Sequence, residues 1–160
     1  MRKTMRLALA LMLGSVPASG IGAAPVEKEK AVSENPNIAV VKQMIAAWDA
    51  RDANRIADLF TEDGVLHSMM IEPIKGRENI RPRMAFLVDN ASYMEIKPRN
   101  FAVVGNTVFL ERTDNFTFKG HSGSVPVVGV LEIEGGKVKE WREYYDRAKL
   151  LEAMGVKENF

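Results

Sequence analysis

The sequence contains no cysteine, which excludes disulfide bonds, a thiol nucleophile and any metal site built on thiolates. Histidine is nearly as scarce, because His67 and His121 are the two in the chain and no His-x-x-x-His pair exists. A zinc site would therefore need carboxylates to complete it. We expect the protein to work without a metal and without any other cofactor.

Neither basic nor acidic residues are in clear excess. Lys and Arg total 22, Asp and Glu total 21, and the formal net charge is +1. A protein that binds nucleic acid or a membrane surface typically carries a basic patch, so we expect neither partner. The chain has 160 residues, 46% of them apolar, which is enough for one domain with a hydrophobic core.

An apolar run near the start, residues 7–16, is too short to span a bilayer, which takes about 20 residues. Basic residues precede this run, and small residues from Ala18 to Ala24 follow it; the basic ones are Arg2, Lys3 and Arg6. That order is typical of a secretory signal peptide. We therefore expect a mature chain that begins between Ala18 and Val26, is periplasmic or secreted, and has no membrane attachment.

Three segments are predicted from this pattern. Residues 1–24 are the signal peptide, and the Lys/Glu-rich residues 25–36 form a flexible leader that ends at a proline. Residues 37–160 form a single domain, because they contain no repeat and no second linker.

Helical spacing dominates the first half of this domain. Apolar residues recur at steps of three and four, at Ile38, Val41, Ile45 and Trp48. A second short helix is expected to include Ile56, Leu59 and Phe60, and a third to cover residues 78–88. A short strand over residues 65–69 lies between them.

The second half is rich in β-branched and aromatic residues. We expect strands over residues 93–104, 107–118, 124–134 and 137–146, with hairpin turns at Gly105-Asn106 and Gly135-Gly136. A short helix over residues 147–154 would close the chain. Helices followed by hairpin-linked strands predict an α+β fold with an antiparallel sheet.

The strand 107–118 carries two charges on its apolar face. Side chains alternate between the faces of a strand, so Arg112 and Asp114 share a face with Leu110 and Phe116. Buried charges must pair or line a cavity. An Arg–Asp pair in a sheet can be a structural salt bridge or part of a functional site.

The strand 137–146 repeats this theme, with Glu143 between Trp141 and Tyr145 on one face. A partly desolvated carboxylate has a raised pKa, which suits general acid/base chemistry. An arginine between two carboxylates could orient both. We predict that Arg112, Asp114 and Glu143 converge in one pocket.

Several motifs along the chain share a resemblance to one known family. They are Leu59-Phe60-Thr61-Glu62-Asp63-Gly64, Met69 with Pro73 and Gly76-Arg77, Glu111-Arg112-Thr113-Asp114, Val127-Val128-Gly129-Val130-Leu131, and Trp141-Arg142-Glu143-Tyr144 after the Gly135-Gly136 turn. They resemble the limonene-1,2-epoxide hydrolase family, over about residues 38–146. That family lies in the nuclear-transport-factor-2-like superfamily. The resemblance implies a cone-shaped, curved antiparallel sheet that packs against N-terminal helices and encloses a pocket.

The resemblance also implies roles for individual residues. Asp114 matches the acid that protonates the epoxide oxygen, Arg112 matches the arginine that bridges two carboxylates, and Glu143 replaces the aspartate that activates water. Leu66 and Ser68 stand where the family has a tyrosine and an asparagine that hold this water. The substitutions weaken the case for hydrolysis more than the case for acid/base chemistry in general.

The remaining site predictions concern binding. We expect the substrate to be contacted by Leu66, Ser68, Met69, Phe116, Trp141 and Tyr145. His67 should point to the face opposite Leu66 and Ser68, with a structural or surface role. His121 lies in a loop that could reach the mouth of the pocket.

Three functions are compatible with this sequence. The first is an epoxide hydrolase-like enzyme acting on a small apolar or aromatic substrate. The second is a cofactor-free lyase or isomerase of an aryl-propanoid, which releases formaldehyde by C–C cleavage or moves a proton. The third is a non-catalytic protein that binds an apolar ligand. The superfamily resemblance also suggests a homodimer.

Overall fold

The computed structural model describes residues 35–156. Most of the predicted signal peptide and leader therefore lies outside the described residues, and their fate stays a prediction. Asn35 and Pro36, at the end of the expected leader, belong to the first helix: the side chain of Asn35 accepts a hydrogen bond from the backbone N–H of Asn37 at 2.9 Å. Pro36 opens the helix, where its missing N–H costs nothing.

Four helices and six strands follow one another along residues 35–156. Their bounds are α1 Pro36–Asp49, α2 Ala53–Asp58, β1 Phe60–Ser68, β2 Ile74–Lys75, α3 Arg77–Asp89, β3 Ala91–Val104, β4 Thr107–Phe118, β5 His121–Glu134, β6 Lys137–Tyr145 and α4 Arg147–Ala153. The predicted α+β class is confirmed. No helix in residues 35–156 is long and apolar enough to cross a membrane.

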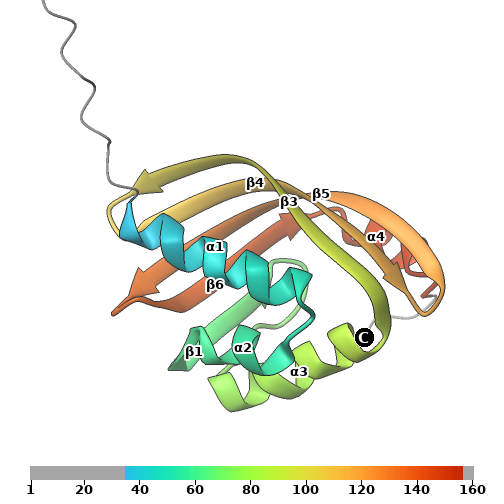
Figure 1. Ribbon diagram of the computed structural model, residues 1–160, viewed down its shortest axis with the longest axis horizontal. Helices are drawn as coiled ribbons and strands as arrows, with labels where there is room; N and C mark the ends of the chain where they lie inside the picture. The colour runs from blue at the N-terminus through green and yellow to red at the C-terminus, as the bar shows by residue number, and fades with distance from the viewer. Residues whose placement is uncertain (1–34, 157–160) are drawn as a thin grey trace, which may run out of the picture. The chain divides into compact units, whose positions relative to one another are not determined.

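The strands form one curved sheet in the order β2-β1-β6-β5-β4-β3. The strands are strongly bent, and the sheet is open at its two edge strands, as in a cone (Figure 1). The sheet is mixed, which corrects the expectation of a purely antiparallel one: β1 runs parallel to β6, with Ser68 beside Glu143. On β3, a β-bulge leaves Arg99 without a register partner on β4, between Pro98 and Asn100. Such bulges bend a strand.

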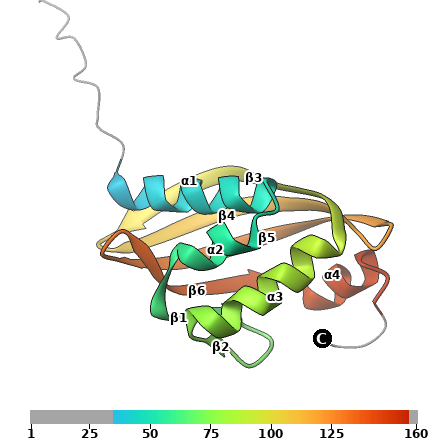
Figure 2. The ribbon, with the colours of Figure 1, turned by 60° about the horizontal axis from the view of Figure 1, so that its bottom comes forward.

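Helices α1, α2 and α3 cover one side of the sheet (Figure 2). Helix α1 packs on β3 and β4, α3 packs on α2 and β1, and α4 packs on β5. The core lies between these layers and includes side chains that are wholly buried, such as Ile56, Phe60, Ile80, Val108 and Leu131. The cavity described below lies where α1, α3 and α4 meet the sheet.

Several predicted boundaries differ from the structure: β1 is Phe60–Ser68 rather than residues 65–69, and β5 begins at His121, which was expected in a loop. Two further differences have identifiable reasons. Leu59 and Phe60 do not continue the second helix, because α2 ends at Asp58 and Phe60 begins β1, where its ring stacks on Trp141. The expected strand 137–146 ends at Tyr145. Asp146 instead caps α4 by accepting a hydrogen bond from the backbone N–H of Lys149 at 3.1 Å.

Candidate active site

The sheet brings the three predicted charged residues together from two strands. Arg112 and Asp114 lie two positions apart on β4, and Glu143 lies on β6, with β5 between these strands. The guanidinium of Arg112 reaches across β5 at Gly129. A Cβ atom at that glycine would lie 2.7 Å from Nη1 of Arg112 and 2.9 Å from Nε1 of Trp141. Glycine at this position thus makes room for the arginine.

Arg112 joins both carboxylates by hydrogen bonds. Its Nε donates to Oδ1 of Asp114 at 2.7 Å, and its Nη2 donates to Oδ2 of Asp114 at 3.0 Å and to Oε1 of Glu143 at 2.5 Å. The Arg112 side chain is 3% exposed, whereas those of Asp114 and Glu143 are 26% and 20% exposed. The arginine is therefore fixed in the interior, and each carboxylate keeps a surface that a ligand can reach.

Burial and charge act in opposite directions on this cluster. Burial alone would lower the pKa of Arg112, but the nearby charges of Glu143 and Asp114 raise it overall, so the guanidinium stays charged. Burial raises the pKa of Glu143 above its ordinary value, and the negative charge of Asp114 adds to this effect, against the attraction of Arg112. A carboxylate with a raised pKa is a stronger base when ionised.

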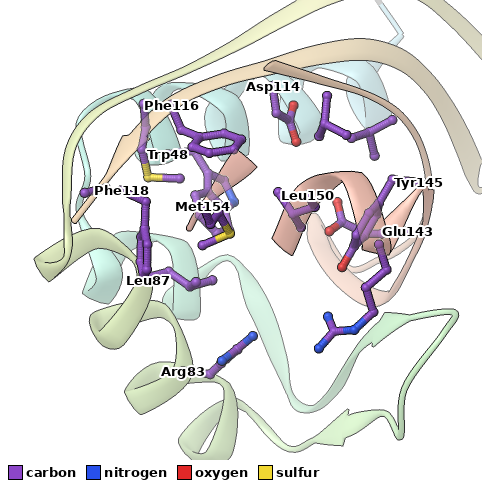
Figure 3. A pocket seen from close by; sticks show the side chains of 15 residues that line it. Trp48, Arg83, Leu87, Asp114, Phe116, Phe118, Glu143, Tyr145, Leu150 and Met154 are labelled. Atoms are coloured by element: carbon purple, nitrogen blue, oxygen red, sulfur yellow. The ribbon is translucent and has the colours of Figure 1, made fainter. Parts of the chain in front are cut away.

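Both carboxylates face an apolar cavity of about 140 Å³, bounded by α1, α3, α4 and the sheet (Figure 3). Two adjoining cavities of about 70 Å³ each share Trp48 and Glu143 with it. Apolar side chains supply most of the main wall, among them Leu87, Met94, Phe116, Phe118, Val125 and Leu150. The polar side chains are Asp114, Glu143, Tyr145, Arg83 and Arg147.

The six expected substrate contacts divide into four groups. Phe116 and Tyr145 line the main cavity, and Leu66 and Ser68 line the adjoining cavity on the β1 side. Trp141 is buried in the core, with the guanidinium carbon of Arg112 5.3 Å from its ring centre. Met69 lies in the exposed turn after β1, away from the lining of the cavities found in residues 35–156.

A polar corner lies beside Glu143. The parallel pairing of β1 and β6 sets Ser68 opposite Glu143, and the hydroxyls of Ser68 and Tyr145 are hydrogen-bonded at 2.6 Å. Ser68, Glu143 and Tyr145 line the same small cavity. Two hydroxyls and a carboxylate can hold a water molecule between them.

The two histidines lie apart from these cavities. His67 is half-buried on β1, opposite Arg142 in register and on the other side of the strand from Leu66 and Ser68. His121 opens β5, is exposed, and packs against Gly155 at the end of α4.

Sequence reasoning missed several cavity residues, among them Trp48, Arg83 and Arg147. Trp48 was expected only on the apolar face of the first helix, yet it lines all three cavities, and its Nε1 is buried without a hydrogen-bond partner in the described residues. Arg83 and Arg147 reach the cavity from α3 and α4. Arg83 stands one residue before the buried Met84, a position that by itself does not indicate a cavity. Nothing in the sequence pattern relates it to the sheet.

Comparisons with known proteins agree with this architecture. A family model described as a SnoaL-like domain matches residues 41–141. The structure of an LEH-like epoxide hydrolase of M. tuberculosis superposes with a TM-score of 0.66 at 21% identity, covering 74% of this chain and 89% of the other.

Two further structures are similar. A protein of Catenulispora acidiphila with a ketosteroid isomerase-like fold gives a TM-score of 0.66 at 22% identity, with 73% and 92% covered. TerC, co-crystallised with polyporic acid, gives 0.67 at 19% identity, with 76% and 100% covered. At these identities the likenesses establish a shared fold.

Proposed function

Since the chain belongs to the family of SnoaL-like domains, within the nuclear-transport-factor-2-like superfamily, we propose that it is a cofactor-independent acid/base enzyme acting on a small apolar or aromatic molecule. This fold includes epoxide hydrolases, polyketide cyclases and isomerases. One observation carries the proposal: Arg112 bridges Asp114 and Glu143 in the wall of an apolar cavity.

The charge balance of this cluster favours a catalytic role. One arginine and two ionised carboxylates leave a net negative charge in an apolar wall, which is costly. A single proton shared by the two carboxylates removes this charge. A cluster that holds one proton between two carboxylates can accept a proton at one group and release one from the other.

Epoxide hydrolysis is the reaction we place first. Water held by the hydroxyls of Ser68 and Tyr145 loses a proton to Glu143 as its oxygen forms a bond to an epoxide carbon. The C–O bond at that carbon breaks, and the released oxygen takes the proton of Asp114. The product is a diol, and proton exchange with solvent restores the pair. The structural likeness to an LEH-like epoxide hydrolase is the reason that epoxide hydrolysis stands first.

Lyase or isomerase chemistry is the second candidate, and Leu66 favours it. Leu66 lines the cavity beside Glu143 where a hydrogen-bonding side chain would help to fix water. Without a fixed water, Glu143 would instead take the proton of the primary hydroxyl of an aryl-propanoid diol. The C–C bond would break as formaldehyde forms its C=O bond, and the carbon that keeps the electron pair would take the proton of Asp114. In a proton shift, Glu143 would take a proton from one carbon of the substrate and return it to another. The likeness to a protein with a ketosteroid isomerase-like fold is compatible with this reaction.

A turnover screen with product mass separates the candidates. Small aryl epoxides and aryl-propanoid diols are incubated with the protein, and we expect epoxide products heavier by one water. Products lighter by one formaldehyde would replace the first candidate with the second. Unchanged masses for all compounds, together with measurable binding, would refute catalysis and leave an apolar-ligand-binding protein.

We also propose that the protein is exported, on the pattern of residues 1–24. Intact-mass measurement of the protein recovered from the periplasm or medium tests this. A mature start between Ala18 and Val26 is expected, and retention of Met1 on a cytoplasmic protein would refute it.

A homodimer is the assembly we propose, because the sheet carries exposed apolar side chains on three neighbouring strands: Phe109, Val128 and Tyr144. Sedimentation equilibrium should give twice the chain mass. Val128→Glu should shift the protein to monomer, and a monomeric wild type at all concentrations would refute the assembly.

A further inference from the structure

Two arginines other than Arg112 line the main cavity. Arg83 lies near the middle of α3, and Arg147 is the first residue of α4; both are half-buried and line the cavity. Figure 3 shows Arg83 pointing into the cavity from the side opposite Asp114. Arg83 also lines the adjoining cavity together with Glu143, so the two guanidinium groups and the two carboxylates belong to one mostly apolar pocket.

The two guanidinium groups are close enough to affect each other. Burial lowers the pKa of Arg83, and the like charge of Arg147 lowers it further. Arg112 shows the opposite behaviour, because two carboxylates raise its pKa. An anion bound between Arg83 and Arg147 would attract both guanidinium groups and so offset the repulsion between them.

We infer that Arg83 and Arg147 form a binding site for an anionic group of the substrate, a carboxylate or a group of similar charge and shape. A guanidinium presents planar N–H donors that match a carboxylate, and such charge-assisted hydrogen bonds are stronger than neutral ones. The substrate class is then an anionic amphiphile. Its charged group lies at Arg83 and Arg147, its apolar body lies along Leu87 and Phe116, and its reacting group meets the carboxylates.

The size of the cavity limits this amphiphile. About 150 Å³ holds one benzene ring in an engineered protein cavity, and the main cavity here has about 140 Å³. The main cavity is therefore about as large as one aromatic ring, and the adjoining cavities of about 70 Å³ each leave room for a short charged side chain. The assignment of the reacting end rests on the proposed acid/base function, whereas the assignment of the charged end does not.

A matched pair of probes tests the anionic site by calorimetry. 3-Phenylpropanoate and its uncharged amide have nearly the same shape, and we expect the carboxylate to bind at least about tenfold more tightly, since a hydrogen bond to a charged group contributes about 1.5–3 kcal/mol. Arg83→Gln and Arg147→Gln should each reduce binding of the carboxylate to the level of the amide. Arg83→Lys, which keeps the charge, should keep part of the preference.

Lys149→Gln is the matched control, because Lys149 lies on α4 with Arg147 but its side chain is 75% exposed. It should leave both affinities unchanged. Equal affinity of the two probes for the wild type, no measurable binding of either, or an unchanged preference in folded Arg83→Gln and Arg147→Gln proteins would overturn the inference. Melting temperatures identify variants that have lost their fold.

The inference and the proposed function can fail separately. A carboxylate preference that persists in Asp114→Asn, with turnover lost, supports both. A preference with no turnover on any screened compound supports the anionic site and refutes the enzyme. Turnover that depends on Asp114, without any carboxylate preference, overturns the anionic site alone.

Discussion

Replacing Gly129 by alanine should disable the site without removing any of its charged residues. The new Cβ atom would lie 2.7 Å from Nη1 of Arg112 and 2.9 Å from Nε1 of Trp141, whereas ordinary contact begins near 3.4 Å. The guanidinium must then move by about 0.7 Å, the difference between 3.4 and 2.7 Å. Trp141 cannot move easily, because it is buried between Trp48 and Phe60.

Such a shift has two measurable effects. Inserting a methyl group into a packed interior costs about 1–3 kcal/mol of folding free energy, so the melting temperature should fall by several degrees. The hydrogen bonds of Arg112 to Asp114 and Glu143 would also lengthen or bend. Misplacing a catalytic group by about 1 Å can reduce a rate by about 10²-fold, and we expect a loss of about tenfold to a hundredfold in kcat.

The assay compares Gly129→Ala with Gly64→Ala, using thermal melts and turnover of a substrate identified by the mass screen. A Cβ atom at Gly64 meets Phe60 and Thr61 at 3.0 Å, in a part of β1 that does not line the cavities found in residues 35–156. Gly64→Ala should lose stability and keep kcat. Wild-type kcat in a folded Gly129→Ala protein would show that the position of Arg112 does not matter, and the reasoning would be refuted.

Further predictions concern the same cluster. Asp114→Asn and Glu143→Gln should each reduce kcat by about 10²–10⁴-fold. The control is Glu111→Gln, on the other face of β4, which should leave kcat unchanged. Equal activity of all three variants would exclude acid/base roles for Asp114 and Glu143. Because the pKa of Glu143 is raised above 4.5, its protonated form stabilises the fold below that pH, and this contribution is lost as pH rises through the folded pKa. The melting temperature of wild type relative to Glu143→Gln should thus fall as pH rises from about 4.5, and a constant or rising difference would contradict the burial argument. Trp48→Phe removes a buried N–H group that has no hydrogen-bond partner in the described residues. Binding of an oxygen-bearing ligand should therefore weaken about two- to tenfold, with no loss of melting temperature. Unchanged binding would show that Trp48 does not donate a hydrogen bond to the ligand.

The charged cluster could be predicted because strand alternation is a strictly local rule. Once residues 107–118 form a strand, Arg112 and Asp114 must share a face with Leu110 and Phe116, and the structure confirms this face as buried. The hairpin turns then place β4, β5 and β6 side by side, so Glu143 comes within reach of Arg112.

Other features depend on interactions between distant segments. Phe60 fits helical spacing as well as strand spacing, and stacking on Trp141 decides in favour of β1. The parallel pairing of β1 with β6 has no signature within either strand. The cavity depends on how α3 and α4 pack on the sheet, so neither Arg83 nor Arg147 could be assigned to it from their neighbours in sequence.

The parallel pairing of β1 with β6 also bears on the order in which the molecule is assembled. Ser68 and Tyr145 are hydrogen-bonded although 77 positions separate them, whereas β3, β4 and β5 are joined by short turns. Contacts between distant segments form more slowly than local ones, because a long loop must close first. During synthesis the β3–β5 hairpins can pair while Glu143 and Tyr145 are still missing from the sheet. We therefore expect a chain that ends before β6 to retain the β3–β5 hairpins. Its site would be incomplete, because Glu143 and Tyr145 lie on β6.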